Sequence, residues 1–479
     1  MRAGLLSSSP MSDIRDILGV DEATLLRMAG AGPRYTSYPT APEWRDDFTE
    51  ADALAACARA AQRPDEPISL YVHLPFCERL CLYCGCTVEI HGHRDRPVSY
   101  LDAVEKELEI VARALGRRRD VNQLHWGGGT PTFLLPDQLE RLWRMITRHF
   151  RVLPGAEVSV EVDPHITTFE QVDLLTSLGF NRVSMGVQDF DPHVQQVVKR
   201  DQTFDETDAL VRRLRERRVD GINIDLMYGL PDQTEAGFGD TLQRITAMRP
   251  DRLAVFGYAH VPWMKPAQKV LEKTATIPQA VERARLFALA VQTLGSAGYE
   301  LIGLDHFALP SDSLWKVLQE GRLHRNFMGY ATAPADEMVS FGMSAIGDLG
   351  GAFVQNARST KEYEPALARG HLATIRGLLR SDEDNLRRAA ILSIMCRMRL
   401  DLDELEQKTG RAGLAEHFAT EWSELQRFVD EGFARWRGAR RLQVLPRGRL
   451  FLRHMAMVFD EYLRRHAAED GKPRFSQTV

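Results

Sequence analysis

The sequence predicts an α/β fold in which a full or incomplete (β/α) barrel is followed by a helical domain. Between about residues 68 and 305, short β-branched runs alternate with longer amphipathic segments, which is typical of repeated βα units around a parallel sheet. After about residue 350 the pattern changes to closely spaced helices. A chain of 479 residues with 44% apolar content also favours two packed units, because single cores stop growing near ~250–300 residues.

Seven short apolar runs are the predicted strands, in the order SLYVHL, NQLHWG, VSVEV, RVSMGV, INIDLMY, RLAVFGY and YELIGL. The segments between them have helical spacing. One carries apolar residues at steps of three and four, at Leu101, Val104, Leu108, Val111 and Leu115. Another, PDQLERLWRMITRHF, has a proline near its start, where a helix tolerates it.

We expect three parts along the chain. Residues 1–50 form an N-terminal extension and arm, 51–349 the barrel, and 350–479 the helical C-terminal domain. In the last part, SDEDNLRRAAILSIMCRM, LDLDELEQKTG and GRLFLRHMAMVFDEYLRRH are predicted helices. The first of them opens with a serine and acidic residues, as a capped helix should.

Unusual polar residues follow the predicted strands at their C-terminal ends. A cysteine-rich loop follows the first strand, GGGTPT the second and EVDP the third. The later strands end at Gln188, at Asp225 with GLPDQT, at residues 258–260, and at Asp305 with His306. Because active sites of α/β barrels and open α/β sheets lie at this edge, the seven segments are expected to converge on one site.

Charge and hydropathy exclude two broad classes of function. The net charge of -5 comes from 61 basic and 66 acidic residues that are mixed along the chain, which gives no strong field for nucleic acid or membrane. The first twenty residues hold no apolar run of signal-peptide length, and no later stretch approaches a membrane span. We therefore expect a cytoplasmic protein.

Four of the six cysteines lie in CERLCLYCGC, residues 77–86. In a reducing compartment such a group binds metal or does chemistry more often than it forms disulfides. Cys77, Cys81 and Cys84, spaced Cys-x3-Cys-x2-Cys, can hold three irons of a four-iron cluster and leave the fourth open to a substrate or cofactor. A structural zinc site is the alternative, although it would normally pair two Cys-x2-Cys units.

The other cysteines are given different roles. Cys86 is interpreted as a neighbour of the cluster, because a fourth thiolate would close the open iron. Cys57 and Cys396 lie in apolar helical segments and are predicted to be buried, inert thiols.

CERLCLYCGC resembles the signature of the radical S-adenosylmethionine (SAM) enzymes, and nearly the whole chain resembles one family among them, the oxygen-independent coproporphyrinogen III oxidases. The segments that carry this narrower resemblance are GPRYTSYPTA, YVHLPFC, the Cys-Gly-Cys ending, HWGGGTPT, EVDP, GVQDF, DLMYGLPDQT, YAHVPW, IGLDHFA, RNFMGY, FGMSAIG and LPRGRLFLRHMAMVFD. The resemblance implies an incomplete (β/α) barrel of the radical SAM type, with an N-terminal arm and a helical C-terminal domain.

The resemblance also implies an activity and its cofactors. A [4Fe-4S] cluster and SAM would yield a 5'-deoxyadenosyl radical, which takes a β-hydrogen from each of two propionates of coproporphyrinogen III. Loss of CO2 and an electron then gives the vinyl groups of protoporphyrinogen IX, in anaerobic heme biosynthesis. A second SAM, a low-potential donor such as flavodoxin or ferredoxin, and a monomeric state are implied as well. The alternatives are a heme-binding chaperone and a heme-modifying radical SAM relative.

Glycines and polar residues after the strands are the candidate SAM contacts. Gly128, Gly129 and Thr130 allow the backbone to approach a ligand closely, although a simple tight turn is the alternative. Glu161 can accept hydrogen bonds from the ribose hydroxyls or the ammonium group of SAM. The resemblance adds three polar contacts, Gln188, Arg200 and Asp225. For Arg200, an ordinary ion pair on a helix surface is the alternative.

Further roles come from the resemblance alone. Tyr71 would lie near the sulfonium, in the reacting centre with Cys77, Cys81 and Cys84; its sequence context alone suggests a core aromatic. Ala259 and Ile346 would line the adenosine pocket, and Phe327 would contact the second SAM. Met328 stands where some members have glutamine, and a thioether cannot donate a hydrogen bond.

The substrate implied by the resemblance carries four carboxylates, so arginines are expected at the entrance to its site. Arg34, in the arm, and Arg325 are the candidates for this role. Solvated surface charge is the alternative for both residues.

Overall fold

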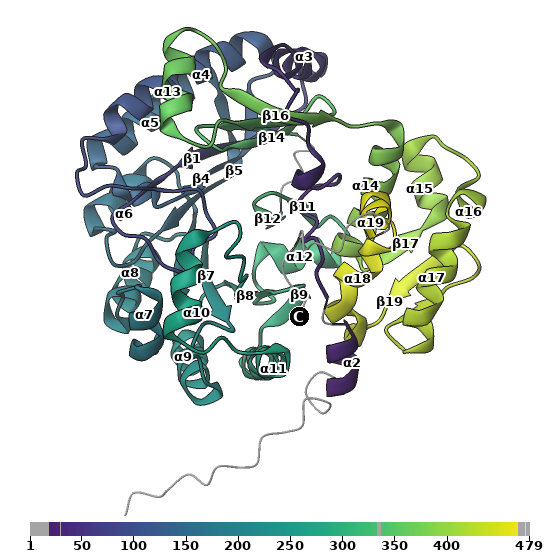
Figure 1. Cartoon of the computed structure of the whole chain (residues 1–479). Coiled ribbons are helices and arrows are strands. Elements are labelled where there is room, and N and C mark those ends of the chain that lie inside the picture. The colour runs from purple at the N-terminus through teal and green to yellow at the C-terminus, as the bar shows by residue number, and fades with distance from the viewer. Residues whose placement is uncertain (1–18, 29, 333–336, 468–474, 476–479) are drawn as a thin grey trace, which may run out of the picture.

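A twelve-stranded mixed sheet, curved and covered by helices on its outer side, forms the larger part of the protein (Figure 1). The computed structural model describes residues 19–28, 30–332, 337–467 and 475. In sheet order the strands are β16 (Thr374–Leu379), β15 (Ala352–Asn356), β14 (Ile346–Leu349), β13 (Met338–Phe341), β1 (Ile68–Leu74), β4 (Asp120–Gly128), β5 (Arg151–Val162), β6 (Arg182–Gln188), β7 (Gly221–Tyr228), β8 (Arg252–Gly257), β10 (His306–Ala308) and β9 (Glu300–Gly303).

The sheet is open, as an incomplete barrel requires. Strands β13 to β8 run parallel, and β16 and β9 are its two edges. All seven predicted strands are present, but β9 is not a direct neighbour of β8. It is separated by β10, which pairs antiparallel with both. The sharp turn after β9, where Leu304 has a φ of 50°, reverses the chain and produces this hairpin.

Helices surround the outer side of the sheet, as Figure 1 shows for α4, α5, α6, α8, α9 and α11. The five apolar residues predicted to share one helix face are all buried on α4, which confirms the period of 3.6. The helices of this part are α2 (Glu22–Met28), α3 (Glu50–Ala60), α4 (Pro97–Leu115), α5 (Pro136–His149), α6 (Phe169–Ser177), α7 (Pro192–Val198), α8 (Phe204–Glu216), α9 (Glu235–Met248), α10 (Leu271–Thr274), α11 (Ala280–Ser296), α12 (Ser313–Gln319) and α13 (Thr360–Ala368).

The C-terminal part is mainly helical and also contains a small sheet. Its first helix begins at a capping box, in which the Ser381 side chain accepts a hydrogen bond from the Asp384 N–H, as the sequence predicts. Its elements are α14 (Asp382–Arg397), β17 (Arg399–Asp401), α15 (Leu402–Thr409), α16 (Leu414–His417), α17 (Ala419–Asp430), β18 (Ala434–Trp436), β19 (Arg441–Val444), α18 (Leu452–Met457) and α19 (Glu461–Ala467). The expected boundary at residue 350 falls inside the large sheet, between β14 and β15.

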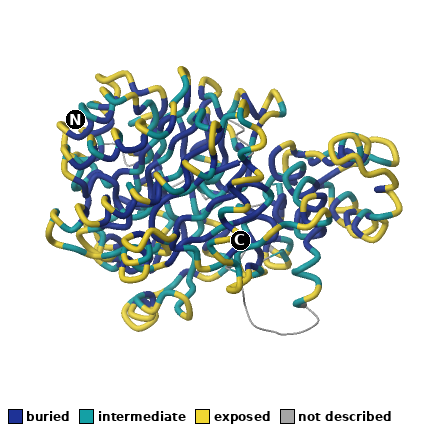
Figure 2. Tube along the Cα trace, turned by 90° about the horizontal axis from the view of Figure 1, so that it is seen from above, coloured by how far each residue is buried: buried dark blue, intermediate teal, exposed yellow. Residues whose placement is uncertain are grey.

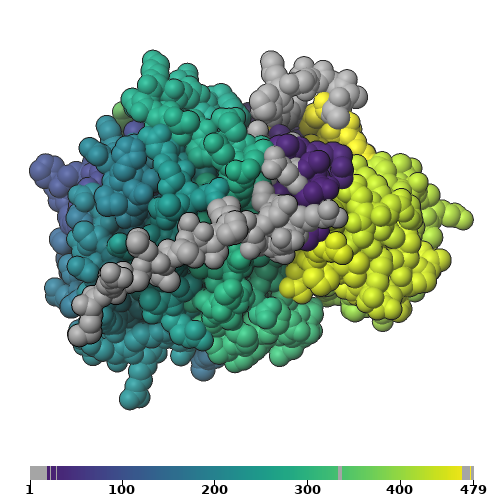
Figure 3. Space-filling model, turned by 90° about the horizontal axis from the view of Figure 1, so that it is seen from below, coloured from purple at the N-terminus to yellow at the C-terminus, as the bar shows by residue number. Residues whose placement is uncertain are grey.

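Two hydrophobic cores correspond to these two parts. One lies between the large sheet and its outer helices, and Figure 2 shows this interior as a continuous buried region. The other joins the C-terminal helices to the arm, through Tyr35 and Tyr38, and to the last strands of the large sheet. In Figure 3 the purple arm lies against the yellow C-terminal domain. Among the described residues, no helix is long and apolar enough to cross a membrane.

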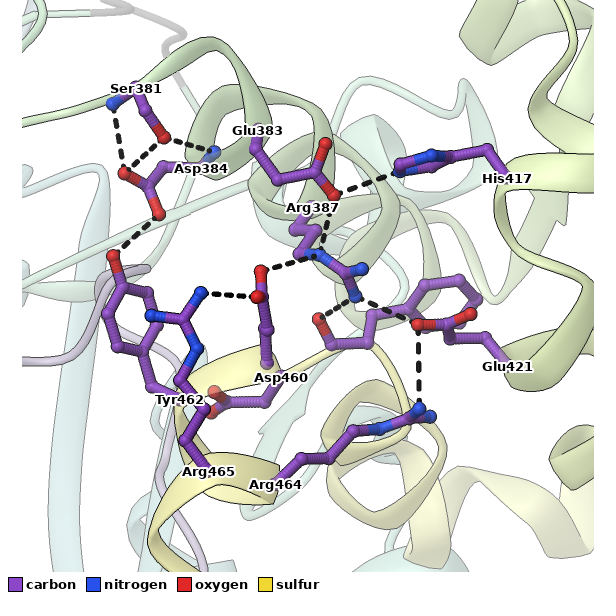
Figure 4. Close-up of polar contacts among 12 residues, drawn as sticks. Ser381, Glu383, Asp384, Arg387, His417, Glu421, Asp460, Tyr462, Arg464 and Arg465 are labelled. Carbon is purple, nitrogen blue, oxygen red and sulfur yellow. Dashed lines mark hydrogen bonds and ion pairs between the residues drawn. The ribbon is translucent and has the colours of Figure 1, made fainter.

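Polar contacts fix the arm to the C-terminal helices. The Tyr35 hydroxyl donates to Asp460 Oδ2 at 2.9 Å, and the Glu461 N–H donates to the Tyr38 hydroxyl at 3.2 Å. Around these residues, Arg387 bonds both Glu383 and Glu421, at 2.8 and 3.0 Å (Figure 4). Since most of these groups are buried, their hydrogen bonds hold α14, α17 and α19 in a definite arrangement.

A buried carboxyl joins α4 to the antiparallel strands of the sheet. Glu107 accepts hydrogen bonds from the Gly342 N–H, Asn356 Nδ2 and the Tyr363 hydroxyl. Burial raises the pKa of Glu107 to about 7, and these three donors oppose the shift.

We expect Glu107→Gln to flatten the pH dependence of stability. Between about pH 4.5 and 7 the folded protein holds a proton on Glu107 that the unfolded chain releases, so stability falls as pH rises, by up to ~1.4 kcal/mol per pH unit. Glutamine does not titrate, so the denaturant midpoint should change less between pH 5 and pH 7. Glu109→Gln, on the exposed side of the same helix, is the control. Equal slopes in wild type and Glu107→Gln would refute this assignment.

Candidate active site

One cavity of about 240 Å³ lies at the carboxyl ends of the parallel strands, where the sequence places the unusual polar residues. The ends of β4, β5, β6 and β7 contribute to it, together with the loop that follows β1. Ten predicted site residues line it: Cys77, Cys81, Cys84, Gly128, Gly129, Thr130, Glu161, Gln188, Arg200 and Asp225. Five of the seven expected segments therefore meet at this cavity, whereas residues 258–260 and Asp305 with His306 are not among the residues that line it.

The cysteine loop is held in place by its own apolar residues. Leu82 and Tyr83 pack into a small core with residues of α7, including Val194 and Val198. The Leu82 N–H donates to the Val198 carbonyl at 2.9 Å. Cys81 and Cys84 are the chain neighbours of these two anchored residues, so the packing fixes where both thiols lie beside the cavity.

All four thiols of the loop line the cavity and are free. Burial raises the pKa of Cys77 to about 12, whereas a hydrogen bond with Cys86 lowers the pKa of Cys84 to about 6. Among the described residues, no group of three or more His, Cys, Asp or Glu side chains is placed to hold a single metal ion. Three separate thiols around one cavity fit a cluster in which each cysteine binds its own iron.

The glycines after β4 form a surface that excludes side chains. Gly128 has a φ of 116°, and a Cβ there would lie 2.6 Å from the His73 ring. A Cβ on Gly129 would lie 2.7 Å from the Phe76 carbonyl oxygen. These positions therefore require glycine, and they bring bare backbone to the cavity beside Thr130, whose hydroxyl is 3.6 Å from Cys77 Sγ.

Glu161 faces the cavity from the end of β5. It accepts hydrogen bonds from His125 Nε2 at 3.3 Å and from the Gly128 N–H at 3.1 Å, which hold its pKa below the usual range although partial desolvation opposes this shift. The carboxylate is thus ionised and fixed in direction, with oxygen lone pairs left for a ligand.

Tyr71 lies beside this carboxylate and is not one of the residues that line the cavity. Its ring stacks on His125 with centroids 5.8 Å apart, and its hydroxyl is 2.9 Å from His73 Nδ1. His73 Nε2 lies 2.9 Å from the Thr87 carbonyl, which can only accept, so Nε2 carries the proton and Nδ1 accepts from Tyr71. Tyr71 and His73 therefore connect β1 to the end of the cysteine loop.

Gln188 and Asp225 reach the cavity from β6 and β7. Gln188 ends its strand in the left-handed region, with a φ of 69°, a conformation that is uncommon for non-glycine residues. Burial, and then the charge of Glu161, raises the pKa of Asp225 to about 7. Of these two carboxyl groups of the cavity, that of Glu161 is ionised and that of Asp225 changes its protonation near neutral pH.

Arg200 is buried beside the cysteines, in the loop after α7. Its guanidinium donates to the Tyr83 hydroxyl at 3.1 Å and to the Gly186 carbonyl, and it lies 3.6 Å from Asp163. An ordinary ion pair on a helix surface does not describe this residue, because its side chain is only 9% exposed and lines the cavity.

Like Tyr71, three further candidates from the resemblance are not among the residues that line the cavity. Ala259 is near it, since its carbonyl accepts from Gln268 Nε2 at 3.2 Å and the same amide donates to the Tyr83 carbonyl at 3.1 Å. Ile346 begins β14, two strands from β1. Phe327 packs against Trp44 and Phe353, with ring centroids 5.6 and 5.9 Å away.

The two candidate substrate arginines lie together, away from the cysteines. Arg34 forms an ion pair with Asp305, and its carbonyl accepts a hydrogen bond from Arg325 Nε at 3.2 Å. Arg325 is buried and its guanidinium lies over the Tyr330 ring, 4.6 Å from the centroid. Solvated surface charge therefore does not describe Arg325.

The structure adds residues that sequence reasoning did not assign. Asp163 and Ser184 line the cavity, Tyr83 bonds Arg200, and Gln268 bonds the Tyr83 carbonyl. Asp163 lies in EVDP and Tyr83 in the cysteine loop, so their neighbours gave a signal. Gln268 lies in a short 3-10 helix, Pro266–Val270, for which the sequence gives no indication of a role.

Comparisons with known proteins agree with this geometry. Residues 71–245 match the model of the radical SAM superfamily. The chain is similar to the oxygen-independent coproporphyrinogen III oxidase of Salmonella typhimurium, with 41% identity over 93% of this chain and 96% of that protein. The enzyme of the same name from Pseudomonas aeruginosa is 40% identical over 97% of this chain and 100% of its own length.

A solved structure, coproporphyrinogen III oxidase (HemN) from Escherichia coli, described as a radical SAM enzyme, superimposes with a TM-score of 0.86. Its sequence is 39% identical, and the match covers 92% of this chain and 99% of that one. The similarity thus extends over both parts of the fold. The chain belongs to the oxygen-independent coproporphyrinogen III oxidases, a family of radical SAM enzymes.

Proposed function

We infer that this protein catalyses the oxidative decarboxylation of two propionates of coproporphyrinogen III to vinyl groups, giving protoporphyrinogen IX in anaerobic heme biosynthesis. The observation that carries this inference is the single cavity in which three cysteines face the glycines of β4 and the polar ends of three further strands. The family to which the chain belongs has this activity in its name.

The residues present fit a [4Fe-4S] cluster and SAM. Cys77, Cys81 and Cys84 would hold three irons, and Cys86 would remain a neighbour whose carbonyl accepts from Lys265 at 2.8 Å. Bound together, cluster and SAM supply the one-electron chemistry that removes a hydrogen atom from an unactivated carbon. The protein binds these groups, orients them and keeps water away from the reacting atoms.

The cavity residues suggest how SAM is oriented. The bare backbone at Gly128 and Gly129 suits close approach of its amino acid end, and Glu161 suits its ammonium or ribose hydroxyls. Gln188, Asp225 and Arg200 would complete the polar contacts around it. The positive charge of Arg200 beside Cys81 would also stabilise the negative charge of thiolates.

The remaining assignments concern residues that do not line the cavity. Tyr71 is proposed to fix the loop near the sulfonium through His73, and Ala259 to face the adenosine, because both lie next to residues that contact the cysteine loop. Ile346 is kept as an adenosine contact on the resemblance alone. A second SAM near Phe327 would have to fit beside its aromatic contacts with Trp44 and Phe353.

Partners and location follow from the chemistry. An electron must reach the cluster, so we propose a low-potential donor such as flavodoxin or ferredoxin. The exposed Cys86 and the other free thiols are suited to a reducing compartment, which agrees with a cytoplasmic location. We propose that the chain acts as a monomer.

Gly128→Ala is expected to weaken SAM binding at least ~10-fold, because the new Cβ would overlap the His73 ring and strain a backbone with positive φ. Gly351→Ala is the matched control, since Gly351 also has a positive φ, 78°, but no heavy atom lies within 4 Å of its Cβ position. Equilibrium dialysis with labelled SAM measures the dissociation constant of SAM for both variants. Equal losses in the two variants would show that strain alone, and not the cavity, explains the effect.

The function is tested by an anaerobic assay of the reconstituted, reduced protein with SAM and coproporphyrinogen III. Mass spectrometry should detect 5'-deoxyadenosine, CO2 and protoporphyrinogen IX together. 5'-Deoxyadenosine without tetrapyrrole conversion would show that the substrate is wrong. Tight heme binding without turnover would favour the chaperone alternative, and an altered macrocycle the heme-modifying one.

A further inference from the structure

Three arginines from distant parts of the chain meet next to the last strands of the large sheet. Arg34 comes from the arm, Arg325 from β11 (His324–Asn326) and Arg453 from α18. Arg325 Nε donates to the Arg34 carbonyl, and burial together with the charges of Arg453 and Arg325 lowers the pKa of Arg34 to about 9. Burial, and to a smaller extent the charge of Arg325, lowers the pKa of Arg453 to about 10. Arg34 and Arg325 are therefore direct neighbours, and Arg453 is near enough for its charge to act on Arg34.

Arg325 has binding capacity that the fold does not use. The residue is 2% exposed, and its Nη1 has no hydrogen-bond partner in the part of the chain that the structure describes. Leaving a buried, charged N–H without an acceptor is costly, and most native proteins avoid it. A ligand that accepts hydrogen bonds here would remove that cost.

The charge around the arginines favours an anion. Asp305 forms an ion pair with Arg34 and a 2.8 Å hydrogen bond with His306 Nδ1. Burial, followed by the charges of Arg325 and Arg34, holds the pKa of His306 well below its usual range, so this histidine is neutral. Asp305 thus shares its charge with two neighbours, and its ion pair to Arg34 does not satisfy Arg325.

Strand register connects this cluster to the cavity. Residues that are paired across neighbouring strands face the same side of a sheet. Asp225 on β7 pairs with Ala254 on β8, and Ala254 pairs in turn with His306 on β10. Phe256, two residues after Ala254, shares that face, and the Arg34 guanidinium lies over its ring at 5.1 Å. The arginines therefore border the same inner face of the sheet as the polar residues of the cavity.

The residue that follows Arg34 in the chain anchors the arm to the C-terminal part. Tyr35 is buried, has a φ of 48° and donates its hydroxyl proton to Asp460. Asp460 belongs to the polar network of the C-terminal helices drawn in Figure 4. Since Arg453 lies on α18 of the same domain, the C-terminal part fixes two of the three arginines relative to the sheet.

From this arrangement we infer that Arg34, Arg325 and Arg453 form a subsite for one carboxylate of the substrate, beside the inner face of the sheet. Guanidinium groups pair with carboxylates through two parallel hydrogen bonds, which fixes direction as well as position. One anchored propionate would turn the macrocycle so that another propionate faces SAM. This inference rests on the proposed function and adds the residues that orient its substrate.

The test compares binding of coproporphyrin III, the stable tetracarboxylate porphyrin, by fluorescence quenching. Arg325→Gln and Arg453→Gln should each weaken binding roughly 10- to 100-fold, the loss expected for a charged hydrogen bond, and Arg325→Lys should weaken it less. In the same two glutamine variants, the KM for coproporphyrinogen III should rise and kcat should change less. Arg380→Gln, which removes a buried arginine paired with Asp348 elsewhere, is the control and should bind normally.

A measurement on the wild-type protein covers the case in which a variant does not fold. The tetramethyl ester of coproporphyrin III should bind at least roughly 10-fold more weakly than the free acid. The subsite is refuted if folded variants that bind SAM normally also bind and convert the tetrapyrrole like wild type, or if ester and acid bind equally. If wild type itself neither binds nor converts the tetrapyrrole, the proposed function fails instead.

Discussion

Cys84→Ser is expected to abolish both the iron-sulfur cluster and the activity. A serine oxygen is a poor substitute for a thiolate in holding iron, and two remaining cysteines would leave two irons without protein ligands. Cys84 also lies where the loop turns, since its N–H donates to the Cys81 carbonyl at 3.1 Å. Iron and sulfide per chain after anaerobic reconstitution, together with 5'-deoxyadenosine formation, measure the loss, which should exceed ~100-fold in activity.

Cys86→Ser is the matched control, two residues away in the same loop. Cys86 lines the cavity and bonds Cys84, so its replacement should change the environment of the cluster but not its iron content. Equal loss of iron in the two variants would show that Cys86 is a ligand. The open iron, on which SAM binding depends, would then have to be reassigned.

Glu161→Gln is expected to weaken SAM binding by about 10- to 100-fold, which corresponds to ~1.5–3 kcal/mol for hydrogen bonds to a charged group. The amide is nearly isosteric, so the effect isolates the negative charge. In the structure that charge is kept by His125 and the Gly128 N–H, and a neutral amide would also leave one of these donors facing an NH2 group. Titration with SAM, followed by the spectrum of the reconstituted cluster, gives the dissociation constant.

Glu157→Gln provides the control on the same strand and the same face. Glu157 pairs with Arg182 and bonds Gln123 and Thr332, away from the cavity lining. The substitution Glu157→Gln should lower the stability of the fold and leave SAM affinity unchanged. If Glu157→Gln weakened SAM binding as much as Glu161→Gln, a general disturbance of β5 would explain both results.

The parallel half of the sheet and its edge of polar residues could be predicted because each strand carries its own local signal. Apolar runs of four to eight residues gave β1, β4, β5, β6, β7 and β8, and side chains at their ends, such as Glu161 and Asp225, had to meet once the strands were parallel. The cysteine spacing also indicated the chemistry of the loop.

The other half of the sheet gave no such signal. Strands β13 to β16 are short, and glycines such as Gly342, Gly350 and Gly351 stand between them, so this stretch gave no recognisable strand pattern before the predicted C-terminal helices. The pairing of β13 with β1 is a tertiary effect, fixed partly by the buried Glu107.

Contacts between residues that are far apart in the chain could not be predicted from the sequence either. Arg34 and Arg325 are 291 positions apart, and Arg453 belongs to another part of the fold; only the packing of the arm against the C-terminal helices brings the three together. In the same way, the role of Tyr71 in fixing the cysteine loop depends on the hydrogen bonds of His73, which periodicity could not indicate.

The central claim is that the residues of the cavity hold a cluster and SAM, which together would supply the radical that takes hydrogen from the β-carbon of the substrate propionates. The most direct measurement uses coproporphyrinogen III with deuterium on those β-carbons and counts deuterium in 5'-deoxyadenosine by mass spectrometry. One deuterium in 5'-deoxyadenosine for each CO2 released is the expected result. Unlabelled 5'-deoxyadenosine accompanying vinyl product would contradict the account, because the hydrogen would then have left by another route.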